Sequence, residues 1–321
     1  MATLLDIADL RLEIGSADGA LVPVDGVSLT VERGRTLALV GESGCGKTLT
    51  CLAVAGLLAP TIRRFGGRIT LDGTALEPDA GEAAAVRRHE VGMIFQDPTG
   101  SLNPVRTIGW QVAEAFVLRA GLSRAAAGRR AVELLELVGI PEPKRRARAY
   151  PHELSGGMNQ RAMIAMAVAG DPSLLICDEA TTALDVTIQA QILDLLRRLQ
   201  RELAMAIVFV THDLATVAQM ADEVAVMYAG RVVEHAPLRP LFKTPRHPYT
   251  HGLLASLPGV DDAGGRLATI PGTVPPLWAM PEGCRFAPRC GRASARCRAE
   301  APALEPLDRA TRAACFHPVG P

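Results

Sequence analysis

The stretch Gly-Glu-Ser-Gly-Cys-Gly-Lys-Thr, residues 41–48, decides the fold class of this chain. A nearly continuous apolar run, 36–40, precedes it and an apolar stretch, 49–58, follows it, which predicts a strand, a loop and a helix. The glycines let backbone N–H groups turn onto phosphate oxygens at a helix N-terminus, whose dipole favours anions. Lys47 can reach the β- and γ-phosphates, and the Thr48 hydroxyl can bind Mg²⁺. The predicted phosphate loop comprises Gly41, Glu42, Ser43, Gly44, Cys45, Gly46, Lys47 and Thr48.

A second apolar run, 174–177, ends in two carboxylates, Asp178 and Glu179. A strand of a parallel sheet would place both at its carboxyl end, beside the phosphate loop. We expect Asp178 to hold Mg²⁺, directly or through water. Glu179 can polarise the attacking water, since phosphoryl transfer needs mainly positioning and charge stabilisation. A capping pair that opens the next helix is the alternative interpretation.

Two more polar residues follow predicted strands, Gln96 after 91–95 and His212 after 206–210. His212 could donate a hydrogen bond to a γ-phosphate, although a histidine at a strand end is more often structural. Gln96 alone is an ordinary polar residue leaving a strand. Strands that alternate with helical stretches, such as 108–138 and 187–201, predict an α/β fold with a parallel sheet.

The overall composition limits the classes of function. Lys+Arg and Asp+Glu both number 34, so no global positive field favours tight non-specific binding of nucleic acid. Apolar residues make up 48% of the chain, but no uninterrupted apolar run reaches the length of about 18 residues that spans a bilayer. The N-terminus lacks the basic start and cleavage site of a signal peptide. We expect a cytosolic chain that meets a membrane only through partners.

The chain after residue 242 is rich in proline and glycine and contains four of the seven cysteines. Clustered thiols in a cytosolic chain suggest metal binding, and four thiolates suit a [4Fe–4S] cluster or tetrahedral Zn²⁺. The spacing lacks the paired Cys-x2-Cys of zinc ribbons, which favours iron–sulfur; unligated thiols are the remaining alternative. His247 and Tyr249, beside two prolines, are expected to brace this tail against the rest of the protein. The four cysteines are Cys284, Cys290, Cys297 and Cys315.

Six motifs occur in the order typical of ATP-binding cassette (ABC) ATPases, and the chain resembles that family. The phosphate loop is 41–48, the Q-loop is Gln96-Asp97-Pro98, and the signature is Leu-Ser-Gly-Gly-Met-Asn-Gln-Arg at 154–161. The Walker B motif is 174–179, the D-loop is Ala183-Leu184-Asp185, and the H-switch is His212. The resemblance implies a P-loop ABC ATPase with a RecA-like core lobe, an antiparallel β subdomain, a helical signature lobe and a Cys-containing C-terminal extension.

The same resemblance implies roles for individual residues. Two such domains would enclose two ATP molecules, each lying between the phosphate loop of one subunit and Ser155, Gly156 and Gly157 of the other. Glu179, His212 and Gln96 would take part in catalysis. Thr48, Gln96 and Asp178 would surround Mg²⁺. Two departures from the family pattern are Ile14, where an aromatic residue would stack on adenine, and Ala180, where proline usually follows the glutamate.

A finer resemblance is to the ATPases of bacterial oligopeptide/dipeptide importers, whose close relatives serve nickel and glutathione uptake. It is carried by the stretches 95–98, 101–104, 150–153, 182–187, 227–230 and 245–250. In some members the Cys-containing tail has been associated with an iron–sulfur cluster. The resemblance implies a nucleotide-binding domain at 1–245, with a helical lobe at about 103–165, and a C-terminal extension at 246–321.

The importer resemblance also implies partners and a location. The chain would work at the cytoplasmic face of the cell membrane with two transmembrane permease subunits, served indirectly by an extracytoplasmic binding protein. A second ATPase subunit completes the ATP sites, and family precedent favours a distinct chain. A soluble ABC protein acting on DNA or ribosomes is the alternative class; the neutral charge, the single cassette and the importer-like tail argue against it.

Overall fold

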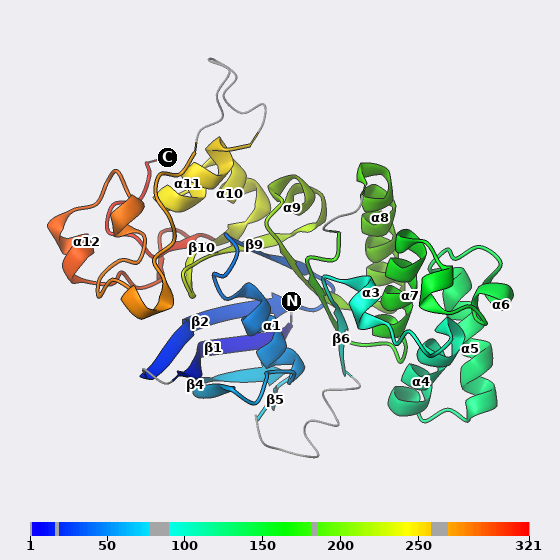
Figure 1. Ribbon diagram of the computed structural model, residues 1–321. Coiled ribbons are helices and arrows are strands. Elements are labelled where there is room, and N and C mark those ends of the chain that lie inside the picture. Colours follow the sequence, from blue (N-terminus) through cyan, green and yellow to red (C-terminus); the bar gives the residue numbers. More distant parts are fainter. Residues whose placement is uncertain (1, 17–18, 78–89, 182–184, 258–268, 321) are drawn as a thin grey trace. The chain divides into compact units, whose positions relative to one another are not determined.

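The computed structural model describes residues 2–16, 19–77, 90–181, 185–257 and 269–320 (Figure 1). The chain divides into two compact units, which are described separately. Unit 1 contains Leu76–Val210 with Met1–Leu4 and Glu32–Arg35, and unit 2 contains Leu5–Val31, Thr36–Ala75 and Thr211–Pro321. The segment after residue 245 therefore belongs to the same compact unit as the phosphate loop.

Unit 1 consists of a parallel sheet and a group of helices. Its strands run in the order β8, β7, β6, and all of these neighbours are parallel. Every residue of these three strands is buried, as the continuous apolar runs predicted. The strands are β6 (Val91–Ile94), β7 (Leu174–Asp178) and β8 (Ala206–Thr211).

The helices of unit 1 include the group α4, α5 and α7, whose members pack on one another (Figure 1). Helix α8 is amphipathic, and Ile192, Leu196 and Leu199 are fully buried on one face. The helical stretch predicted over 108–138 is confirmed and consists of two helices: Gly121 adopts a left-handed φ of 63° and Ser123 caps a new helix, so α4 and α5 are separate. The helices are α3 (Pro98–Ser101), α4 (Ile108–Ala120), α5 (Arg124–Leu137), α6 (Pro143–Arg146), α7 (Gly156–Val168) and α8 (Val186–Leu203), with a 3-10 turn at Pro151–Glu153.

Unit 2 contains the antiparallel β subdomain that the family resemblance implied. Its strand order is β2, β1, β4, β5, and β1 pairs with β4 from Leu5↔Leu71 to Ile14↔Ile62. The register shifts between Ala8 and Arg11, around Asp9, whose φ of 51° marks a β-bulge. The strands are β1 (Thr3–Ser16), β2 (Gly19–Glu32), β4 (Ile62–Leu71) and β5 (Thr74–Ala75).

A second group of strands in unit 2 combines residues from both ends of the sequence. Strand β3 is parallel to β9, β9 is antiparallel to β10, and the C-terminal strands β12 and β11 continue from β10. The C-terminal segment thus extends the sheet that begins beside the phosphate loop. The strands are β3 (Thr36–Val40), β9 (Glu223–Tyr228), β10 (Arg231–Pro237), β11 (Glu305–Pro306) and β12 (Arg312–Ala313).

The C-terminal extension shares a buried core with the strands of unit 2. Tyr249, Leu254 and Phe286 are buried in one cluster with Val226 and Tyr228 of β9. The contacts agree with the expected bracing role of His247 and Tyr249: Tyr249 packs with residues of β9, and the His247 N–H donates to the Glu234 carboxylate of β10 at 2.8 Å. The helices of unit 2 are α1 (Lys47–Ala55), α9 (Leu214–Met220), α10 (Leu238–Lys243), α11 (Pro248–Ala255) and α12 (Ala295–Ala299), with 3-10 turns at Leu277–Ala279 and Ala287–Arg289.

In the parts of the chain that the structure describes, no helix has both the length and the apolar character needed to cross a membrane.

Candidate active site

The phosphate loop connects β3 to α1 in unit 2, as predicted. Gly41, Gly44 and Gly46 have φ values of 155°, 77° and 100°, in the region that favours glycine. A Cβ atom on Gly41 would lie 2.2 Å from the carbonyl oxygen of Met227, and one on Gly46 would lie 2.9 Å from that of Pro23. Both the backbone conformation and the close packing therefore exclude a side chain at these two positions.

Lys47 folds back over the loop that precedes it. Its Nζ donates hydrogen bonds to the carbonyl oxygens of Gly41 at 2.8 Å and Glu42 at 3.0 Å. Burial raises the pKa of the neighbouring Cys45 thiol, so this cysteine stays protonated and fills space beneath the loop. Ser43, Gly44 and Thr48 are exposed on the outside of the loop. Their expected contacts to phosphate and Mg²⁺ remain predictions.

The two carboxylates and Gln96 meet at the carboxyl edge of the sheet in unit 1. The parallel register pairs Ile94 of β6 with Cys177 of β7, so the residues two places further along also lie side by side. The Nε2 atom of Gln96 donates to Oε2 of Glu179 at 2.9 Å. Asp178 is buried at the end of β7 and Glu179 is half-buried. The structure thus brings together three of the residues proposed from the sequence.

Glu179 adopts an unusual backbone conformation. Its φ of 49° is left-handed, which is uncommon for a residue other than glycine, and its N–H donates to the carbonyl of Val210 at 3.0 Å. Strained backbone of this kind is concentrated at functional sites. Ala180, where proline was expected, is buried directly after it.

The signature segment begins helix α7 of unit 1. The Ser155 hydroxyl caps this helix by accepting the N–H of Met158 at 3.3 Å, while Gly156 is exposed and Gly157 half-buried. Gln160, whose side chain is buried, donates from Nε2 to the carbonyl oxygen of Ala180 at 2.7 Å. No role for Gln160 was predicted, because it lies between two other polar residues, Asn159 and Arg161, and no local pattern distinguishes it from them.

His212 lies in unit 2, directly after β8, and its side chain is exposed. The adjacent Asp213 caps α9 by accepting the N–H of Ala215 at 2.9 Å. This placement at a strand end agrees with the sequence, and the proposed contact to a γ-phosphate remains a prediction. Of the D-loop, Ala183 and Leu184 fall outside the described residues.

The four C-terminal cysteines line one small cavity, together with His317. Burial raises the pKa of Cys284 and raises that of Cys315 to about 11, so these thiols are protonated at neutral pH. Among the described residues, no group of three or more His, Cys, Asp or Glu side chains is placed to hold a metal ion. The arrangement does not fit the [4Fe–4S] cluster or the Zn²⁺ predicted for Cys284, Cys290, Cys297 and Cys315, and that prediction is not supported.

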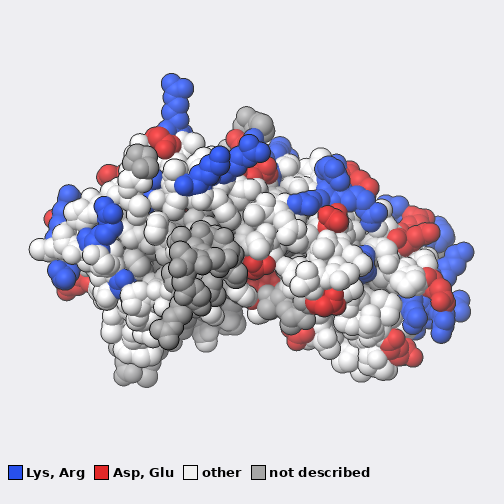
Figure 2. Space-filling model, turned by 90° about the horizontal axis from the view of Figure 1, so that it is seen from above, with Lys and Arg blue, Asp and Glu red and all other residues white. Residues whose placement is uncertain are grey.

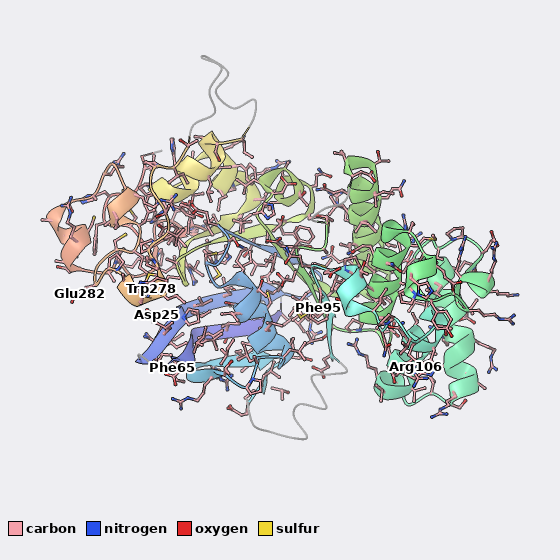
Figure 3. All side chains as sticks on the ribbon, viewed as in Figure 1. Asp25, Phe65, Phe95, Arg106, Trp278 and Glu282 are labelled. Atoms are coloured by element: carbon pink, nitrogen blue, oxygen red, sulfur yellow. The ribbon has the colours of Figure 1, made fainter. Side chains whose placement is uncertain are left out.

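A charged cluster joins the C-terminal extension to the β subdomain within unit 2. Asp25 on β2, labelled in Figure 3, accepts from Arg11 at 2.8 Å, Arg231 at 2.6 Å and Arg285 at 2.6 Å. Burial alone would raise the pKa of Asp25, but the hydrogen bond and charge of Arg231, with the charges of Arg285 and Arg11, hold it below its usual value.

The extension also contacts the phosphate loop, through hydrogen bonds that were not predicted from the sequence. Nη1 of Arg289 lies 3.0 Å from each carboxylate oxygen of Glu42, and the Tyr249 hydroxyl accepts the Glu42 N–H at 3.0 Å. No local pattern signals these contacts, because the partners are 247 and 207 residues apart in the sequence.

Comparison with known proteins identifies two families in the chain. Residues 24–182 match the family described as ABC transporter, and residues 233–297 match the family described as oligopeptide/dipeptide transporter, C-terminal region. A putative peptide import ATP-binding protein of Brucella melitensis is 49% identical over 98% of this chain and 96% of its own length. The oligopeptide transport ATP-binding protein OppD of Salmonella typhimurium is 47% identical over 98% of this chain and 94% of its own length.

Solved structures resemble the chain in the same way. The ATP-binding cassette MJ0796, in a dimeric post-hydrolysis state bound to ADP and Pi, has a TM-score of 0.65 and 26% identity, and covers 74% of this chain and 99% of its own. The cbiO1 protein of Clostridium perfringens, part of an ABC transporter complex, has a TM-score of 0.64 and 28% identity over 75% of this chain and 91% of its own. These matches confirm the predicted α/β P-loop fold and the enzyme class, an ATPase. The chain belongs to the ABC transporter family, and its C-terminal part is of the oligopeptide/dipeptide transporter type.

Proposed function

We propose that this protein hydrolyses ATP to power the import of peptides through a membrane permease. The observation that carries the proposal is the similarity to peptide import ATP-binding proteins over nearly the whole chain, including the C-terminal extension. This full-length match favours peptides over nickel or glutathione. It also argues against a soluble ABC protein acting on nucleic acid, in agreement with the mixing of acidic and basic side chains on the face shown in Figure 2.

The family resemblance implies a division of labour among the residues proposed for ATP hydrolysis. The phosphate loop, Gly41 to Thr48, would bind the phosphates of ATP through its N–H groups and Lys47. Glu179 would accept a proton from the attacking water, and Gln96, which donates to Glu179, would orient that carboxylate. His212 would donate a hydrogen bond to the γ-phosphate.

Oxygen atoms suited to Mg²⁺ come from Thr48, Asp178 and Gln96. A hydroxyl, a carboxylate and an amide carbonyl are the hard oxygen ligands that this ion prefers. When bound, Mg²⁺ neutralises charge on the β- and γ-phosphates.

A second ATPase subunit would complete the ATP sites. Ser155 and Gly156 are exposed at the start of α7, so they are accessible to the ATP of a partner. The related cassette MJ0796 is dimeric in its structure with ADP and Pi. By family precedent, this second subunit would be a distinct chain.

The permease would contact the helical part of unit 1. Phe95, Val105 and Trp110 are large apolar side chains with exposed fractions of 37%, 74% and 42%, and Arg106 covers the Trp110 ring at 4.5 Å from its centroid. Apolar side chains exposed in this way are typical of surfaces that partners cover. The protein would bind two permease subunits at the cytoplasmic face of the membrane. An extracytoplasmic binding protein would supply the substrate to these subunits.

The proposed nucleotide-binding domain ends at residue 245 and includes the helical lobe at about 103–165.

Uptake by cells that lack this chain tests the function. Wild-type protein, supplied on a plasmid, is expected to restore uptake of a labelled peptide, whereas Glu179→Gln is not. Nickel and labelled glutathione are measured in the same cells. Restoration of either of these, without peptide uptake, would replace the peptide assignment by that substrate; restoration of none would refute an import function.

A further inference from the structure

The C-terminal extension fixes one residue of the phosphate loop at several atoms. The carboxylate of Glu42 accepts from Arg289 Nη1, with both oxygens at 3.0 Å, and its N–H donates to the Tyr249 hydroxyl at 3.0 Å. Its carbonyl oxygen accepts from Lys47 Nζ at 3.0 Å. Glu42 therefore connects the extension to the lysine that is expected to reach the phosphates.

Arg289 is itself held in place before it reaches Glu42. Its Nε donates to the carbonyl of Pro271 at 2.9 Å, and Nη1 lies 3.4 Å from the Tyr228 hydroxyl. Only 5% of its side chain is exposed, against 29% for Glu42. A hydrogen-bonded charge pair that is largely removed from water is costly to break on one side. The guanidinium is thus a rigid partner for Glu42.

Tyr249 is also fixed in position by its surroundings. It is fully buried, its ring centroid lies 4.7 Å from that of Tyr228 and 5.5 Å from that of Phe286, and it stands in the first turn of α11. His247 caps this helix by accepting the Tyr249 N–H at Nδ1, at 3.1 Å, and burial lowers its pKa to about 3, so the ring remains a neutral acceptor.

From these contacts we infer that Arg289 and Tyr249 are positioning residues for ATP: they hold Glu42, and through it the phosphate loop and Lys47, in the conformation that binds phosphate. The inference rests on the proposed ATP site and adds to it two residues that do not touch the nucleotide. Its physical basis is preorganisation, since a loop that is already ordered loses less conformational entropy when it binds a ligand. The extension is in this sense part of the ATP site.

Binding of a fluorescent, non-hydrolysable ATP analogue with Mg²⁺ to the full chain tests the inference. Arg289→Met is expected to raise the Kd about tenfold, because it removes a hydrogen bond between charged groups. Tyr249→Phe, which removes only a hydroxyl, should raise it about threefold. Arg289→Lys should not restore wild-type affinity, since an ammonium cannot keep the separate contacts to Glu42 and Pro271.

A double-mutant cycle separates positioning from general damage. If Arg289 acts through Glu42, the pair Arg289→Met with Glu42→Gln binds the analogue no more weakly than the poorer single variant; independent effects would multiply. Arg298→Met, at an exposed arginine of α12, is the matched control and should bind like wild type. Thermal unfolding is recorded for every variant, and affinities are measured where all are folded. If Arg289→Met does not fold, the affinity of Tyr249→Phe for the analogue tests the inference instead.

Failure of the positioning role and failure of the proposed ATP site give different results. Wild-type affinity in folded Arg289→Met and Tyr249→Phe, even with lowered melting temperatures, would overturn this inference and leave a purely structural contact. Lys47→Ala tests the site itself and should abolish binding. If the wild-type chain does not bind the analogue, or if Lys47→Ala binds it equally well, the proposed ATP site fails instead.

Discussion

Gln96 donates a hydrogen bond to Glu179 at 2.9 Å, and the two side chains come from neighbouring parallel strands at equivalent positions beyond the paired residues Ile94 and Cys177. The amide can donate to a carboxylate and offers its own carbonyl oxygen elsewhere. Any movement of the segment that follows β6 would therefore change the environment of Glu179. This relationship connects the loop facing the proposed permease surface to the group proposed to activate water.

Replacing Glu179 by glutamine should abolish turnover but not ATP binding. A positioned general base contributes a factor of about 10² to 10⁴ to the rate, and the amide cannot accept a proton. Steady-state phosphate release and analogue binding are measured side by side. Glu202→Gln, the same substitution at an exposed position of α8, is the control. Turnover within a few-fold of wild type would remove Glu179 from the mechanism.

Replacing Gln96 by glutamate should shift the pH dependence of turnover. Two carboxylates at the distance now spanned by a hydrogen bond cannot both ionise easily, so the pair shares a proton and its upper pKa rises. Activity should fall at neutral pH and recover as the pH is raised, whereas Gln96→Ala should lower activity without this recovery. An unchanged pH–rate profile in Gln96→Glu would contradict the contact.

Gly156→Ala should leave stability unchanged and reduce ATP hydrolysis. A Cβ atom at Gly156 would meet no other atom within 4 Å in this chain, so its only expected clash is with the ATP of a partner subunit. Gly128→Ala, in the interior of α5, is the comparison, because a Cβ atom there would also meet no other atom within 4 Å. It should stabilise the protein by about 0.5 to 1 kcal/mol. Melting temperatures and turnover are measured for both. Normal hydrolysis by Gly156→Ala in the assembled ATPase pair would argue against the shared site.

Asp25→Asn should destabilise unit 2 by about 3 kcal/mol, because three arginines lose their shared carboxylate. The pKa of Asp25 is lowered on folding, so its contribution is present above the unfolded value of about 3.9 and is lost as the pH falls through the lower folded value. Urea unfolding at neutral and acidic pH should show the difference between wild type and variant shrinking in acid. Asp194→Asn, at an exposed pair, should cost less than about 1 kcal/mol.

The Cys284 and Cys315 thiols, whose pKa values are raised by burial, should react slowly with iodoacetamide at neutral pH, and Cys315 should react faster as the pH approaches its pKa of about 11. Mass spectrometry after timed alkylation follows each cysteine separately. Iron, zinc and acid-labile sulfide are determined on the same anaerobically prepared sample. Stoichiometric metal, with all four thiols protected from alkylation, would show that the four cysteines bind a metal and would contradict the arrangement described here.

Most of the site could be predicted because its signals are local. The phosphate loop, the strand ending in Asp178 and Glu179, and the capping serine of the signature each follow from a few adjacent residues. The break between α4 and α5 is a weaker local signal, since Gly121 and Ser123 interrupt an otherwise continuous helical composition. The contacts of Arg289 could not be predicted, because it is one of several arginines in 285–298 and only the tertiary fold distinguishes it.

The contact between Glu42 and Arg289 has a consequence for synthesis on the ribosome. Glu42 emerges 247 residues before its partner, which at common elongation rates is a delay of roughly 12 to 50 s. During that interval the nascent chain has a complete phosphate-loop sequence but lacks the arginine that holds it. If Arg289 holds the loop as inferred, the order of translation postpones a fully formed nucleotide pocket until residue 289 has been synthesised.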